Sequence, residues 1–250
     1  DAYGRTDTGP VRESNEDQLL IDLENGVFLL ADGMGGHAAG EVASEMAVAT
    51  AHEVLVHGED PDETRLVRDV DPQDPADVLR ERMRYAMNQA SVRIRREAEI
   101  RPETRGMGTT LVILVLEGEH AHLAHVGDSR AYLYRNGRLT RLTRDHTVVQ
   151  QQIDDGGLTP ELARFAAHKN ILTQSVGFHG PVEPDTTTRI VEPGDIFILC
   201  SDGLTDPLTD TDIAHLCGET PFESLADVLT DEALRAGGED NVTVIAVQVR

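Results

Sequence analysis

The chain has 250 residues, of which 39% are hydrophobic and 27% charged, a composition typical of a water-soluble globular protein. Its 45 acidic and 22 basic residues give a formal net charge of −23, which repels phosphate backbones, so we expect no nucleic-acid partner. No apolar run approaches the roughly 20 residues that span a bilayer, so we expect no membrane contact by this chain.

The first predicted elements are two strands joined by a turn, followed by two helices. A stretch rich in proline and acidic residues separates the helices, and we expect it to be disordered or tolerant of insertions. In chain order these elements are Gln18–Asp22, the turn Glu24-Asn25-Gly26, Val27–Ala31, Ala38–His57, the stretch Gly58–Asp77 and Ala76–Ala98. The apolar residues of both helical segments recur near helical spacing.

The middle of the chain alternates short strands and tight turns. The pair Asn136-Gly137 is a strong signal for a two-residue hairpin, and hairpins require antiparallel pairing. The predicted strands here are Thr109–Leu116, His120–Val126, Ala131–Arg135 and Arg138–Leu142.

The strand pattern stops between Asp145 and Gln174. This stretch is typical of two short helices separated by Gly156-Gly157, the second capped by Thr159 with Pro160 in its first turn. We expect a helical flap at about residues 145–174, a common place for a lid or specificity element. Beyond it follow two strands, a helix and a last strand: Thr186–Val191, Ile196–Cys200, Phe222–Ala236 and Asn241–Val249.

The longest predicted strands are apolar at consecutive positions, so both of their faces must be covered. Two stacked antiparallel sheets with helices outside meet this need around one core. We therefore predict an α+β fold, a four-layer α/β/β/α sandwich with a helical flap insertion, as a single domain over residues 1–250. We expect a monomer.

The two cysteines, Cys200 and Cys217, form no CxxC pair, and we expect buried thiols in a reducing compartment. The chain begins at Asp1 and not at a methionine. We therefore expect a cytoplasmic protein or the cytoplasmic part of a larger or anchored one.

Acidic residues flank several of the predicted strands. They are Glu16 and Asp17 before the first strand, Asp32 and Asp202 after two apolar strands, Asp128 in a strand connection and Asp240 before the last strand. Singly, each is typical of a turn. Together, strand ends that converge on one edge of a sandwich would bring these carboxylates into a small volume, where their repulsion needs neutralising.

A divalent cation would neutralise such a cluster best. Oxygen ligands without cysteine favour Mg²⁺ or Mn²⁺. An aspartate shared between two such ions would hold a water that becomes a hydroxide-like nucleophile, an arrangement suited to attack on a phosphate ester. Arg12, four residues before Glu16, could bind the phosphate, since guanidinium matches its oxygens bidentately.

These segments resemble, in order, the motifs of the metal-dependent protein phosphatases of the 2C type, and most closely the small bacterial serine/threonine phosphatases. The resemblance covers roughly residues 4 to 249 and rests on six motifs, each weak by itself and specific as a series. They are Arg12-Glu13-Ser14-Asn15-Glu16-Asp17, Asp32-Gly33-Met34-Gly35-Gly36-His37, Gly106-Met107-Gly108-Thr109-Thr110, Gly127-Asp128-Ser129-Arg130, Ser201-Asp202-Gly203-Leu204 and Glu239-Asp240-Asn241.

The resemblance implies a role for each position. Asp32 would bridge two Mn²⁺ or Mg²⁺ ions, with the Gly33 carbonyl on one of them and Asp202 and Asp240 on the other. Glu16 and Asp17 would act beside the pair, largely through water. Asp128, with Asp202, would form a third and weaker site. The implied substrates are proteins carrying phosphoserine or phosphothreonine, made by serine/threonine kinases, with no phosphoenzyme intermediate.

Two positions depart from the family pattern. Animal members carry a histidine directly after the Asp-Gly pair, thought to protonate the leaving group, and this chain has Met34 there. We take His37 as the candidate general acid in its place. The flap ends in Leu172-Thr173-Gln174, where related bacterial enzymes usually have arginine last, which puts the substrate preference in question.

Two other classes of function remain to be distinguished. One is a regulatory relative that binds phosphoproteins without turnover; the presence of Asp32, Asp202 and Asp240 argues against it. The other is a dinucleotide-binding oxidoreductase, because residues 33–38 fit G-x-G-x-x-A after a strand. Asp32 beside an anionic pyrophosphate and the hairpin-linked strands oppose that interpretation.

Overall fold

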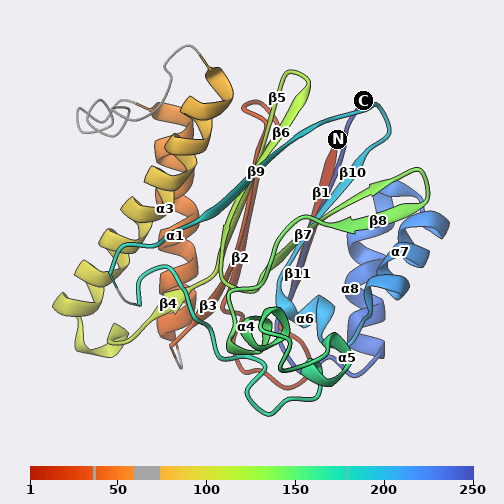
Figure 1. Ribbon diagram of the computed structural model, residues 1–250. Helices are drawn as coiled ribbons and strands as arrows, with labels where there is room; N and C mark the ends of the chain where they lie inside the picture. Colours follow the sequence, from red (N-terminus) through yellow and green to blue (C-terminus); the bar gives the residue numbers. More distant parts are fainter. Residues whose placement is uncertain (36–37, 59–73, 179) are drawn as a thin grey trace.

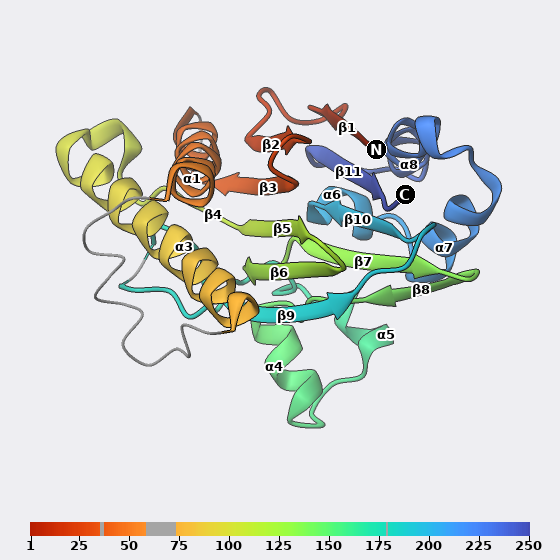
Figure 2. The ribbon, with the colours of Figure 1, turned by 90° about the horizontal axis from the view of Figure 1, so that it is seen from above.

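Two antiparallel sheets lie face to face at the centre of the computed structural model, which describes residues 1–35, 38–58, 74–178 and 180–250. Helices cover the outer face of each sheet, so the predicted α+β sandwich of four layers is confirmed (Figures 1 and 2). In Figure 2 the sheets stand between α1 and α3 on one side and α7 and α8 on the other.

Each sheet combines strands from distant parts of the chain. The first has the order β1 (Ala2–Asp7), β11 (Val242–Gln248), β10 (Ile196–Cys200), β7 (Arg130–Arg135) and β8 (Arg138–Arg141). The second has the order β2 (Asp17–Asp22), β3 (Val27–Met34), β5 (Leu111–Glu117), β6 (His120–Val126) and β9 (Asp185–Ile190), with β4 (Gly108–Thr109) paired to the end of β3.

The helices divide between the two sheets. The second sheet is covered by α1 (Ala38–His57) and α3 (Pro75–Ile100), and the first by α6 (Asp202–Thr205), α7 (Asp210–Glu219) and α8 (Leu225–Arg235). Short 3₁₀ turns occupy Pro102–Thr104 and Phe222–Ser224. Among the residues that the structure describes, none of the helices has both the length and the apolar character that a membrane crossing requires.

Consecutive apolar residues of a strand pack into different layers of the interior. In β3, Leu29 and Ala31 pack toward α1 and α3, whereas Phe28 and Leu30 pack against Phe197 of the opposite sheet. Because each sheet is buried on both faces, the apolar interior consists of separate layers, one between the sheets and one under each set of helices. The expectation of one core was wrong in this respect.

Local signals account for several boundaries. Asn136 and Gly137 both have positive φ, 52° and 77°, as a two-residue hairpin turn of type I′ requires. Asp74 caps α3 by accepting from the Ala76 amide at 2.9 Å, so this helix begins earlier than expected, inside the predicted disordered stretch. Most of that stretch, residues 59–73, lies outside the described residues.

The segment from Asp145 to Gln174 contains α4 (Val148–Asp154) and α5 (Pro160–Ala163), as the flap prediction requires. The Thr147 and Thr159 side chains cap these helices, accepting from the amides of Gln150 and Leu162. In Figure 1 the flap lies at the end of the sandwich opposite the two termini. It therefore stands beside the strand ends where the acidic residues were expected.

Candidate active site

A cleft of about 410 Å³ opens at this end of the sandwich. It brings together most of the side chains singled out in the sequence, from both sheets and their connections. Its lining includes Arg12, Glu16, Asp32, Gly33, Asp128, Asp202 and Asp240. Asp17, only 7% exposed, is the register partner of Asp32 on the adjacent strand. His37 lies outside the described residues.

One hydroxyl connects the two sheets beneath the cleft. Ser201, the residue between β10 and Asp202, donates to Asp17 Oδ2 at 2.8 Å and accepts from the Thr243 amide at 3.0 Å. Asp17 starts a strand of one sheet, whereas Ser201 directly follows β10 and Thr243 lies in β11 of the other. The bond therefore holds the two acidic strand ends at a fixed spacing.

Threonines fix the backbone of Asp32. The Asp32 amide donates to Thr110 Oγ1 at 2.9 Å, and Thr109 Oγ1 donates to the Asp32 carbonyl at 2.8 Å. The Thr110 hydroxyl also shares a hydrogen bond of 2.7 Å with Ser129 Oγ, next to Asp128. This network joins the positions of Asp32 and Asp128, a role that the sequence did not reveal.

Asn241 ties the N-terminal loop to the last strand. Its Oδ1 accepts from the Glu16 amide at 2.8 Å, and its Nδ2 donates to the carbonyls of Thr8 and Ser14 at 2.8 and 3.0 Å. The loop carries Arg12 and Glu16, and Asn241 directly follows Asp240. Its place inside a recognised motif was the available signal for this role.

Gly33 permits the closest backbone approach in the cleft. A Cβ atom there would lie 2.1 Å from the Gly40 carbonyl oxygen of α1 and 2.6 Å from that of Glu16. The Gly33 amide donates to the Glu16 carbonyl at 3.1 Å. Any side chain at this position would push α1 away from the strand end.

Four aspartates at the cleft disfavour ionisation: Asp17, Asp32, Asp128 and Asp202. Burial is the largest cause: it raises the pKa of Asp32 and Asp202 well above the usual range, and repulsion from Asp17, Asp128 and Asp240 adds to it. Burial likewise raises the pKa of Asp17 to about 6 and that of Asp128 to about 7. Such crowding of acids is characteristic of a cation site.

Within the part of the chain that the structure describes, two buried carboxylate oxygens have no hydrogen-bond partner, Glu16 Oε1 and Asp17 Oδ1. Buried polar atoms are almost always paired, so these atoms are suited to ligands outside the protein. Mg²⁺ and Mn²⁺ prefer oxygen ligands of this kind. The residues present therefore fit divalent cations.

Arg12 stands at the rim with its side chain 49% exposed. Its Nη2 donates to Asp240 Oδ2 at 2.7 Å, and this bond is the main cause that raises the pKa of the guanidinium. The arginine is thus a fixed positive charge beside the carboxylates, positioned to meet an anionic ligand.

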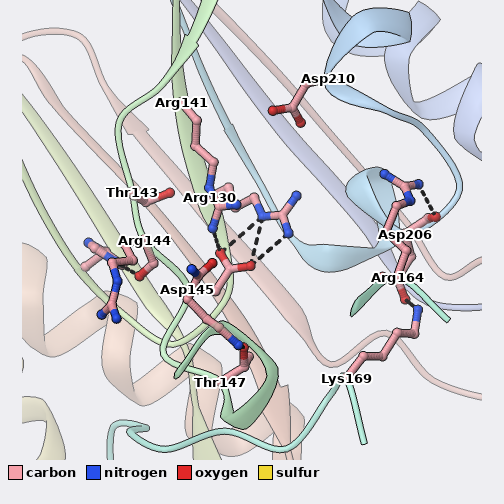
Figure 3. Close-up of polar contacts among 12 residues, drawn as sticks. Arg130, Arg141, Thr143, Arg144, Asp145, Thr147, Arg164, Lys169, Asp206 and Asp210 are labelled. Atoms are coloured by element: carbon pink, nitrogen blue, oxygen red, sulfur yellow. Dashed lines mark hydrogen bonds and ion pairs between the residues drawn. The ribbon is translucent and has the colours of Figure 1, made fainter. Parts of the chain in front are cut away.

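A second cavity, of about 300 Å³, lies between the flap and the first sheet and shares Asp128, Asn170 and Asp202 with the cleft. Lys169 Nζ contacts Asp206 Oδ2 at 2.5 Å, and Arg164 donates to the Asp206 carbonyl at 3.0 Å (Figure 3). Both flap residues thus hold the segment that follows Asp202 along the chain.

Comparison with known proteins places the chain in a family. Residues 11–237 match the protein phosphatase 2C model. The chain is 38% identical over 245 residues to the serine/threonine protein phosphatase PstP of Mycobacterium tuberculosis, covering 98% of this chain and 44% of that protein. It is 36% identical over 248 residues to the serine/threonine phosphatase stp of Listeria welshimeri, covering 98% and 94%.

A solved structure agrees in fold. The catalytic domain of PstP in complex with two manganese ions matches with a TM-score of 0.80 and 38% identity, over 99% of this chain and 97% of that one. The chain belongs to the protein phosphatase 2C family, which confirms the resemblance of its motifs. It spans less than half the length of the PstP relative.

Family membership also decides against the dinucleotide-binding alternative. In the described residues, α1 after β3 leads to α3 and not to a parallel strand, and the paired strands are antiparallel throughout. A dinucleotide-binding unit needs a parallel β-α-β crossover. The G-x-G-x-x-A match at residues 33–38 was therefore coincidental.

Proposed function

We propose that this chain hydrolyses phosphoserine and phosphothreonine in proteins with the help of divalent cations. The observation that carries the proposal is the convergence of buried carboxylates on one cleft, including the unpartnered oxygens of Glu16 and Asp17, with Arg12 at its rim. Membership of the protein phosphatase 2C family and the chain's similarity to serine/threonine phosphatases of bacteria support it.

The proposed cations are two Mn²⁺ or Mg²⁺ ions, with a third bound more weakly. Asp32, the Gly33 carbonyl, Asp17, Asp202 and Asp240 would hold the pair, and Glu16 would act through water. Asp128 with Asp202 would hold the third. When bound, such ions add positive charge at the phosphate oxygens and make water a better nucleophile near neutral pH. The two manganese ions of the PstP catalytic domain support this assignment.

The chain's own residues would bind and orient the phosphate ester. Arg12 would turn its guanidinium from Asp240 toward two phosphate oxygens, a bidentate geometry that lysine could not reproduce. The rigid loop contacts of Asn241 would keep Arg12 and Glu16 at the rim. His37 remains the predicted donor of a proton to the leaving serine or threonine oxygen.

The proposed partners are phosphoproteins made by serine/threonine kinases, and the proposed compartment is the cytoplasm. Both cysteines, Cys200 and Cys217, are buried thiols without a disulfide, as a reducing compartment favours.

The test is hydrolysis of p-nitrophenyl phosphate and of matched phosphothreonine and phosphotyrosine peptides by the purified chain. We expect turnover that requires Mn²⁺, stops with EDTA and returns with added Mn²⁺, with the phosphothreonine peptide preferred. Binding of Mn²⁺ by a folded sample without turnover would favour the regulatory relative. A folded sample that neither binds Mn²⁺ nor turns over would refute the proposal.

A further inference from the structure

Two stacked histidines lie where the flap joins the sandwich. His125 of β6 and His146, just before α4, are both buried, and their rings lie 4.8 Å apart at an angle of 15°. Neither side chain lines the cleft. The stack nevertheless adjoins the connection between β6 and β7 that carries Asp128.

His146 holds the residue before Asp128 at two atoms. The His146 amide donates to the Gly127 carbonyl at 2.9 Å, and the Gly127 amide donates to His146 Nδ1 at 3.2 Å. Gly127 has a φ of 103°, and a Cβ there would lie 2.6 Å from Thr110 Cγ2. The backbone is thus held in a conformation that only glycine adopts easily, and the imidazole is the partner of its amide.

The surroundings fix which ring nitrogen carries the hydrogen. Because Nδ1 of His146 accepts the Gly127 amide, the neutral ring carries its hydrogen on Nε2, which lies 3.3 Å from Asp185 Oδ2. Histidine and aspartate side chains, such as His125, His146 and Asp185 here, can bind transition metals. In this tautomer, however, Nε2 of His146 carries the hydrogen and has no lone pair for a metal. His125 Nε2 donates to the Arg144 carbonyl at 2.8 Å, which keeps the stack in place.

The rest of the connection is held as firmly. Ser129 bonds to Thr110, and Arg130 makes a bidentate pair with Asp145, which also contacts Arg141 (Figure 3). Asp145 and His146 are consecutive residues at the start of the flap. The segment therefore fixes the connection on both sides of Asp128, and Asp128 itself lines both the cleft and the adjoining cavity.

We propose that His146 is a positioning residue for Asp128: its Nδ1 holds the Gly127 amide and thereby sets the direction of the Asp128 carboxylate toward a divalent cation. The inference rests on the proposed function, in which Asp128 helps to hold the weakest cation. It joins the base of the flap to that cation site. Substituting a residue that orients a metal ligand without touching the metal typically lowers metal affinity or activity 10- to 100-fold.

Three variants test the proposal because they differ in where they place an acceptor. In His146→Asn, Oδ1 stands close to the position of Nδ1 and can still accept from Gly127. In His146→Gln the amide oxygen reaches farther, toward the position of Nε2, and His146→Ala has no acceptor. Calorimetry measures stepwise Mn²⁺ binding, kinetics measures kcat and KM for p-nitrophenyl phosphate against Mn²⁺ concentration, and melting measures stability.

We expect His146→Ala and His146→Gln to weaken the weakest Mn²⁺ binding by about 10- to 100-fold. Their kcat should fall at limiting Mn²⁺ and recover at high Mn²⁺, while KM changes less. His146→Asn should retain Mn²⁺ affinity near that of the unmodified chain. This asparagine rescue is the result that a role in general stability would not produce.

Other outcomes overturn the inference. Equal Mn²⁺ affinity in all three variants, with or without lower melting temperatures, would reduce His146 to a structural role. An asparagine variant as weak as the alanine variant would also contradict it, as would the absence of a third Mn²⁺ in the unmodified chain. If His146→Ala does not fold, the comparison of asparagine with glutamine decides. Mn²⁺ binding without turnover in the unmodified chain would refute the proposed function, and calorimetry would still test the inference.

Discussion

Among the hydrogen bonds of the described residues, the Arg12 side chain takes part in one, the bond of 2.7 Å to Asp240. We predict that Arg12→Ala raises KM about tenfold or more, because a charge-assisted bidentate contact to the substrate is lost. The free energy of unfolding should change by less than about 1 kcal/mol, since an exposed ion pair contributes little.

Steady-state kinetics with a phosphothreonine peptide measures this effect. Arg250→Ala is the matched control, because Arg250 forms an exposed ion pair with Asp1 at the chain termini, far from the flap in Figure 1. An unchanged KM in Arg12→Ala would remove Arg12 from the site.

Asp202 combines burial with repulsion from several carboxylates, which together raise its pKa well above the usual range. We predict that Asp202→Asn lowers kcat by more than about 100-fold. Substituting a residue that only orients a metal ligand already lowers activity by up to about 100-fold, and Asp202 is proposed as a ligand itself. Without metal, the same variant should melt at an equal or higher temperature, because one repelling group has been removed.

Melting curves with and without Mn²⁺ test whether Asp202→Asn keeps its metal-free stability while losing the stabilisation by Mn²⁺. The unmodified chain should gain stability from Mn²⁺, and Asp202→Asn should gain much less. Substantial residual turnover, or an undiminished Mn²⁺ effect on melting, would contradict the assignment of Asp202 as a ligand.

Two side chains of the flap contact the segment that follows Asp202. Lys169, the one lysine of the sequence, and Arg164 both reach Asp206, four residues after Asp202. We predict that Lys169→Ala changes kcat/KM for a phosphothreonine peptide more than for p-nitrophenyl phosphate, because the peptide extends beyond the phosphate and makes more contacts with the flap. Arg138→Ala, at an exposed position of β8, is the control. Equal changes for both substrates would argue against a role of the flap in substrate choice.

The elements found from the sequence are those with strong local signals. The hairpin at Asn136-Gly137 and the caps at Thr147 and Thr159 depend on neighbouring residues only. Strand β1 was missed because its exposed and half-buried residues alternate weakly, and its pairing with β11 is a contact between the two ends of the chain. Helix α7 was also missed, although Thr209 and Asp212 form a capping box that the sequence displays.

The same distinction applies to the site. The acidic positions could be predicted because each follows or precedes an apolar strand within a motif. The bonds from Ser201 to Asp17 and from Thr110 to Asp32 could not, because they join residues 184 and 78 positions apart. Such contacts depend on how the strands pair and how the two sheets stack, and local patterns carry no information about that.

At the scale of the whole molecule, the cluster of buried acids lowers the free energy of unfolding near neutral pH. The pKa of Asp17 is about 6 and that of Asp128 about 7 in the folded chain, both raised mainly by burial, against an ordinary value near 4 in the unfolded chain. Between these values the folded state binds more protons than the unfolded state. The stability that these two groups contribute is therefore fully present below their unfolded pKa of about 4, and it is lost as the pH rises through their folded pKa values.

We predict that the metal-free chain melts at a higher temperature at pH 5.5 than at pH 8, and that Mn²⁺ stabilises it more at pH 8, because the cations require ionised carboxylates.

The net charge of −23 also favours stability at the lower pH, because repulsion among the exposed acids weakens as they bind protons, but salt screens exposed charges more than buried ones. Melting curves at high salt separate the two causes. Asp128→Asn should flatten the dependence on pH, whereas Asp155→Asn, at an exposed position, should leave it as it is. A metal-free chain that is more stable at pH 8 than at pH 5.5 in high salt would contradict the prediction that these buried acids bind protons more tightly in the folded chain.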